Sequence, residues 1–140
     1  MPVSKFSVSL SPDATKQIES RPGDRSSVIT QCLERYYNAL AYSRRKLSDL
    51  LSVGEISAVL DALNGVAMLD AWSPAYIQQE LADGIELNGL DAKWKIEGKA
   101  LVKKLAALDY IDKCALADAA ERWWGRVGDG ENPKPDEALK

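Results

Sequence analysis

The feature that most constrains the fold is a strictly alternating segment near the N-terminus, Lys5–Leu10. In it, Phe6, Val8 and Leu10 alternate with polar residues, so the apolar side chains share one face of an extended strand. A lone strand of this length is not stable, because its backbone N–H and C=O groups lack partners. The alternation therefore predicts a short, half-buried strand that must pair with another strand.

Two helices are expected directly after this strand. The Ser-Pro-Asp sequence at residues 11–13 combines a serine cap, a first-turn proline and an early acidic residue, and it predicts a short helix. That helix ends before the Pro-Gly turn at residues 22–23. A second helix is predicted over residues 26–42, with an apolar stripe too wide for one short neighbouring helix to cover. The residues of that stripe are Val28, Ile29, Cys32, Leu33, Tyr36, Tyr37 and Leu40.

The unpaired strand and the wide stripe both find partners if two copies of the chain associate. The two strands would pair as an antiparallel ribbon, and the two second helices would pack across each other. We therefore expect a homodimer. Its core is predicted to contain apolar residues of the strand and of the second helix: Phe6, Val8, Leu10, Ile29, Leu33 and Tyr36.

Residues 3–42 resemble the ribbon–helix–helix family of DNA-binding proteins. The resemblance is carried by the strand FSVSL, the SPD helix start, the glycine turn and the second helix RSSVITQCLERY. It implies a fold in which the paired strands enter the DNA major groove and their outward side chains read bases. In this chain those outward side chains are Lys5, Ser7 and Ser9.

The same resemblance assigns a phosphate contact to the start of the second helix, where Arg25, Ser26 and Ser27 lie. A helix N-terminus suits an anion, because its N–H groups are unpaired and its dipole is positive there. We also expect Arg44 and Arg45 to contact phosphates that flank the site. The basic stretch that contains them either continues the second helix or forms a linker.

Charge is distributed unevenly along the chain. Residues 1–46 hold eight basic and four acidic side chains, a net charge of +4. The remaining residues hold 10 basic and 17 acidic side chains, a net charge of −7. A basic head on an acidic body is what a polyanionic partner such as double-stranded DNA requires.

The rest of the chain predicts an all-α bundle of about four helices, with apolar residues at helical spacing. Ser52 with Glu55 forms a capping box, and Asp109 is a second helix cap. Four tryptophans lie in this part, in its core or lining a ligand pocket. We therefore expect a mainly α protein with a DNA-binding and dimerisation domain over residues 1–45, an all-α domain over residues 46–128 and a disordered, polar tail over residues 129–140.

The sequence lacks the residues that other classes of function need. It has no histidine and only two cysteines, Cys32 and Cys114, so we expect neither a zinc site nor a histidine-based catalytic triad. It has no glycine-rich phosphate loop, no secretory signal and no apolar run of about 18 residues. The expectation is a cytoplasmic protein that is not an enzyme, with no metal, no cofactor and no membrane partner.

The function we expect is that of a homodimeric, sequence-specific DNA-binding protein that acts as a transcriptional repressor. Its helical domain would add contacts between copies, or bind a protein or a small molecule. Two alternatives stay open. The same DNA-binding head serves in antitoxins and in plasmid partition or conjugation accessory proteins, and an N-terminal strand can instead extend a partner's sheet in a protein-interaction module without DNA binding.

Overall fold

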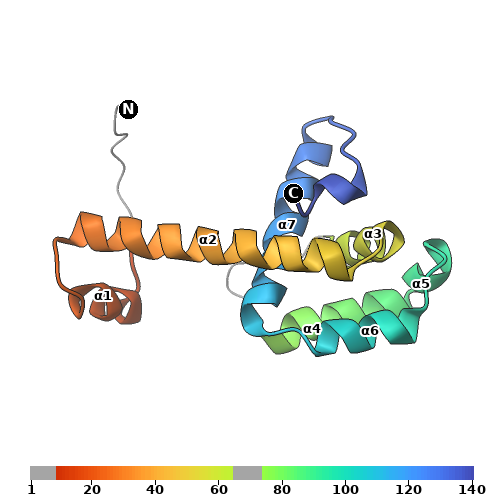
Figure 1. Ribbon diagram of the computed structural model, residues 1–140, viewed down its shortest axis with the longest axis horizontal. Helices are drawn as coiled ribbons and strands as arrows, with labels where there is room; N and C mark the ends of the chain where they lie inside the picture. The colour runs from red at the N-terminus through yellow and green to blue at the C-terminus, as the bar shows by residue number, and fades with distance from the viewer. Residues whose placement is uncertain (1–8, 65–73) are drawn as a thin grey trace. The chain divides into compact units, whose positions relative to one another are not determined.

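The computed structural model describes residues 9–64 and 74–140 (Figure 1). Contacts divide the chain into two compact units, Met1–Asn38 (unit 1) and Ala39–Lys140 (unit 2), so the division falls before the predicted boundary after residue 45. The described elements are, in order, α1 (Pro12–Glu19), α2 (Arg25–Leu50), α3 (Val53–Ala62), α4 (Pro74–Ala82), the π-helix η2 (Asp83–Leu87), α5 (Leu90–Lys93), α6 (Gly98–Ala106), α7 (Tyr110–Gly128) and the 3-10 helix η3 (Pro135–Glu137).

The predicted ribbon–helix–helix class, with its β-strand, is wrong: the residues that the structure describes are helical or irregular and contain no strand. Ser9 and Leu10, the end of the predicted strand, have no regular secondary structure. A strand needs a second strand for its backbone hydrogen bonds, and the described part of the chain offers none. The mainly α part of the prediction is confirmed. The rest of the predicted strand lies outside the described residues: Lys5, Phe6, Ser7 and Val8.

Helices α3 and α7 begin with the caps that the sequence predicts. The Ser52 hydroxyl accepts the Glu55 N–H at 3.2 Å, and the Glu55 carboxylate accepts the Ser52 N–H at 3.0 Å, which completes the capping box. The carboxylate of Asp109 accepts the N–H of Asp112 at 2.9 Å. Each cap supplies an acceptor to an N–H group that has no partner within its helix.

Helix α2 continues beyond the predicted end near residue 42 and includes the basic stretch, which is therefore not a linker. Leu40 and Leu47, two turns apart on one face of the helix, are both completely buried. Covering an aliphatic side chain of this size stabilises the fold by about 1.5–3 kcal/mol, which favours the helix through the segment between them. Burial against the rest of unit 2 thus sets the length of α2.

The core of unit 2 is aliphatic and is shared by α2, α3, α4, η2, α6 and α7. Figure 1 shows α4 and α6 lying side by side, and residues of the two helices are in contact. η2 packs closely on α3. The two elements approach so closely that a Cβ atom added at Gly84 would lie 2.7 Å from the Ala62 Cβ atom. The largest fully buried apolar side chains of the described part are Leu40, Leu47, Val59, Ile77, Leu81, Ile85, Leu101 and Leu105.

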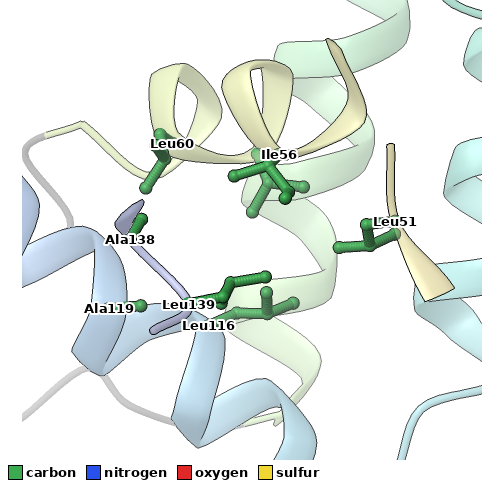
Figure 2. Close-up of a pocket in the computed structure, with 8 residues that line it drawn as sticks. Leu51, Ile56, Leu60, Leu116, Ala119, Ala138 and Leu139 are labelled. Carbon is green, nitrogen blue, oxygen red and sulfur yellow. The ribbon is translucent and has the colours of Figure 1, made fainter. Parts of the chain in front are cut away.

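The C-terminal residues differ from the predicted disordered tail, because they fold back onto the core. Ala138 and Leu139 are 9% and 4% exposed and, with α3 and α7 side chains such as Ile56 and Leu116, line one small apolar pocket. Figure 2 shows Leu139 next to Leu116 in this pocket. The polar composition of residues 129–137 suggested disorder, but the two apolar residues near the end are enough to hold the tail against the helices.

Two ion pairs connect distant segments of unit 2. Lys46 Nζ lies 2.5 Å from the carboxylate of Asp112, whose side chain is only 2% exposed, and Lys104 Nζ lies 3.0 Å from the carboxylate of Glu55. Burial by itself raises the pKa of Asp112, but hydrogen bonds from Lys46 and Ser43 outweigh it, so the pKa lies below its ordinary value. Burial also raises the pKa of Glu55, and the Ser52 N–H and Lys104 outweigh it in the same way.

Unfolding in acid tests these two pairs. Because both carboxyl groups have lowered pKa values in the folded chain, their contribution to stability is complete above their unfolded pKa of about 4 and is lost as the pH falls through the folded values. We expect the free energy of unfolding, measured with urea, to decrease steadily below about pH 4.5. Asp112→Asn should flatten this decrease, and an unchanged slope in that variant would contradict the assignment.

Candidate functional site

The first half of α2 and the short helix before it form the part of the chain in which the sequence places its functional residues. Helix α1 starts at Pro12 behind Ser11, whose hydroxyl accepts the N–H of Ala14 at 3.1 Å. The turn into α2 passes through Gly23 with φ +110°, a backbone conformation that favours glycine. The result is a helical hairpin in which most side chains reach solvent.

The N-terminus of α2 is capped by a side chain of the protein itself. The Asp24 carboxylate accepts the N–H of Ser27 at 3.0 Å and its hydroxyl at 2.9 Å. The hydrogen bond from the Ser27 N–H, followed by that from its hydroxyl, lowers the pKa of Asp24. Asp24 lies three residues before Ser27, which is the spacing of a side-chain N-cap.

This cap bears directly on the predicted phosphate contact. Asp24 places a negative charge where the phosphate was expected, and its carboxylate already accepts the Ser27 N–H. The guanidinium of Arg25 lies 2.6 Å from the carboxylate of Glu19, and both side chains are 60% exposed. Ser26 is exposed. A phosphate at this end of α2 would therefore compete with a carboxylate that already holds the helix N–H group.

The two arginines further along α2 have different surroundings. Arg44 is largely buried, with 18% of its side chain exposed, and lies 3.9 Å from the carboxylate of Asp118. Arg45 is exposed and borders a shallow hollow beside Tyr42 and Asp49. Of the two predicted phosphate contacts, Arg45 is the more exposed.

The described residues of the predicted dimer core, and the other residues of the predicted apolar stripe near them, are only partly covered in the single chain. Val28 is buried at 3% exposure, and Leu10, Ile29 and Cys32 are partly buried. Leu33, Tyr36 and Tyr37 are 47%, 38% and 57% exposed, and the rings of the two tyrosines meet edge to face at 5.5 Å. We call the surface formed by the α2 side chains of this set that reach solvent the α2 apolar face: Ile29, Cys32, Leu33, Tyr36 and Tyr37. It combines aliphatic and aromatic side chains, as interface cores do.

Unit 1 has little core of its own. Within residues 9–38, Val28 is the only apolar side chain that is buried, whereas Ala14 and Ile18 of α1 remain partly exposed. A hairpin of this size that buries one apolar side chain does not offset the conformational entropy lost on folding. Leu33 and Tyr37 therefore remain exposed in the single chain.

The tryptophans of the described residues belong to the packing of unit 2. Trp94, Trp123 and Trp124 lie against the core, and the indole N–H of Trp124 donates to the Leu60 carbonyl at 2.8 Å. The indole N–H of Trp94 donates to the Asp61 carboxylate at 2.7 Å. Trp72 lies outside the described residues. Trp123 packs edge to face on Trp124, with ring centroids 4.7 Å apart, and its buried indole N–H has no hydrogen-bond partner among the described residues.

In the segments that the structure describes, no cluster of three or more metal-binding side chains occurs, and no helix has the length and apolarity needed to cross a bilayer. No protein-family model matches the chain, and no curated protein or solved structure matches it either. The α2 apolar face of unit 1 is therefore the candidate functional site.

Proposed function

We propose that this protein is a homodimeric, sequence-specific DNA-binding regulator of transcription that assembles through the α2 apolar face. The observation that carries the proposal is the exposure of Leu33 and Tyr37, at 47% and 57%, on a unit whose described residues bury only Val28. Exposed apolar side chains grouped in this way are typical of association surfaces.

A second copy of the chain is the partner that fits this face best. A two-fold axis brings the same stripe onto itself, so one apolar surface covers its equivalent without a second surface of different shape. A second copy would supply the apolar cover that unit 1 lacks, and another copy is available wherever the chain is made. Interfaces of such obligate homodimers are also more apolar than other interfaces, in agreement with the leucine and tyrosine content here.

The charge of the N-terminal part favours DNA as the ligand of the dimer. Residues 1–46 carry a net charge of +4, and a dimer brings two such segments together. Arg35 and Arg45 are exposed on α2 and are available for phosphate contacts. Basic side chains of this kind position a protein on the duplex by releasing counterions from its phosphates. The proposal keeps the cytoplasm as the location of the protein.

The test combines oligomeric state with DNA selection. The purified full chain is examined by analytical ultracentrifugation and then used to select duplexes from a random library, with affinities measured by fluorescence anisotropy. We expect a dimer and a recurrent selected sequence. If the dimer contacts about six phosphates, raising the salt concentration from about 50 to about 200 mM should weaken binding about a thousandfold. A monomer, or a dimer that selects no sequence, would overturn the proposal.

One observation favours a second candidate, a protein-interaction module that does not bind DNA. Two of the predicted phosphate contacts, Arg25 and Ser27, already have partners within the chain. In that case the dimer would form as proposed, but the protein would bind no duplex at any salt concentration. The same pair of measurements therefore distinguishes the two functions.

A further inference from the structure

A small cluster of charges in unit 2 has one more positive than negative group. The guanidinium groups of Arg44, on α2, and Arg122, on α7, lie 3.9 Å and 3.2 Å from the same carboxylate oxygen, Asp118 Oδ2. Arg122 is half exposed, whereas Arg44 and Asp118 are 18% and 22% exposed. The cluster therefore lies at the surface with its negative member partly covered and a net charge of +1.

Arg44 has few partners for its hydrogen-bond donors. A guanidinium carries five N–H groups, and a hydrogen bond to oxygen requires a separation of about 3.2 Å or less. The contact of Arg44 with Asp118 is longer than that. Partial burial, and then the neighbouring charge of Arg122, lower the pKa of Arg44, whereas Asp118 raises it. Two guanidinium groups are thus close enough to repel each other, and one carboxylate does not supply enough acceptors for both.

We propose that Arg44 and Arg122 together bind a phosphate group beside Asp118. A phosphate adds the missing negative charge and presents several acceptor oxygens to two planar, forked donors, an arrangement that guanidinium groups favour. Where this phosphate belongs to a DNA backbone, the inference rests on the proposed function and adds Arg122 to the contacts predicted from the sequence. The other source of the same chemistry is a free, phosphate-bearing small molecule.

Asp118 gives the proposal a distinctive consequence. Its carboxylate fills part of the space that the phosphate would take and neutralises part of the positive charge that would attract it. Asp118 therefore competes with the ligand. Removing Arg122 and removing the charge of Asp118 should therefore change affinity in opposite directions. A purely structural ion-pair cluster would show no such opposition, because both substitutions would only weaken the packing of α2 on α7.

The experiment uses the full chain with two probes, inorganic phosphate and a fluorescent DNA duplex selected as above. Phosphate binding is followed by NMR shifts of the arginine Nε–H groups, and duplex binding by anisotropy. Arg122→Gln should weaken binding about tenfold, and Asp118→Asn should tighten it severalfold. Lys99→Gln, which removes an exposed positive charge from α6, is the matched control and should leave affinity nearly unchanged.

The outcomes separate the two sources and the two proposals. Opposite effects on both probes assign the site to the DNA backbone, and opposite effects on phosphate alone assign it to a free phosphate-bearing molecule. If the wild-type protein binds no duplex but its phosphate binding follows the pair of substitutions, the proposed function fails and the phosphate site stands. If the two substitutions alter neither probe, or alter both in the same direction, the phosphate site is overturned.

Discussion

Leu33→Glu is expected to convert the homodimer into a monomer. Leu33 is 47% exposed in the single chain, so a glutamate costs little there, but in a dimer it would place a charge inside an apolar interface. A two-fold axis brings both copies of the residue to the interface, so two charges are buried and the free energy of association is reduced twice. We expect association to weaken by about 3 kcal/mol or more, which is at least about a hundredfold in dissociation constant.

Gln31→Glu is the matched control for this substitution. Gln31 is exposed, and at a spacing of two residues it lies on nearly the opposite side of α2 from Leu33. It introduces the same charge into the same helix, so it should leave the dimer intact in sedimentation experiments. DNA affinity should fall with the dimer in Leu33→Glu. If the Leu33→Glu protein remained dimeric, either α2 would associate through a different face or the dimer would form without α2.

Gly84→Ala adds a single methyl group. We expect it to destabilise unit 2 more than the same substitution does at an uncrowded glycine. The added Cβ atom would lie 2.7 Å from the Cβ atom and 3.0 Å from the Cα atom of Ala62, and the second of these belongs to the backbone of α3. Neither atom can rotate away, so η2 and α3 must separate. We expect the free energy of unfolding, measured with urea, to fall by about 1–3 kcal/mol.

Gly125→Ala provides the comparison within the same protein. Gly125 lies in α7, and an added Cβ atom there would meet nothing within 4 Å. Alanine loses less conformational freedom than glycine in a helix, so this substitution should stabilise the chain by about 0.5–1 kcal/mol. If Gly84→Ala raised stability in the same way, the close packing of η2 on α3 would be disproved.

The starts of helices were predictable because their signals are local. Ser11, Ser52 and Asp109 each accept an N–H group three residues ahead, so a short stretch of sequence contains the whole interaction. Asp24 follows the same spacing at the start of α2, where its carboxylate accepts the N–H of Ser27. The candidate apolar face was likewise visible in the sequence as a stripe at helical spacing.

Features that depend on distant residues were not predictable in this way. The tail was expected to be disordered. Leu139 is instead buried beside Leu51, Ile56 and Leu116, which lie far from it in the sequence. The environment of Arg44 depends on Asp118 and Arg122, which lie far along the chain on another helix. No local pattern connects these positions, because their contact arises from the packing of α2 and α7.

The sequence by itself therefore determined that the chain is mainly helical, where most of its helices begin, and that its first part is basic with an exposed apolar stripe. Only the tertiary structure decided how far α2 extends, that the C-terminus packs into the core, and which acidic groups face the arginines. The physical reason is the separation along the chain over which each kind of interaction acts. Caps and periodicity act within one or two helical turns, whereas burial and ion pairing depend on which surfaces the fold brings together.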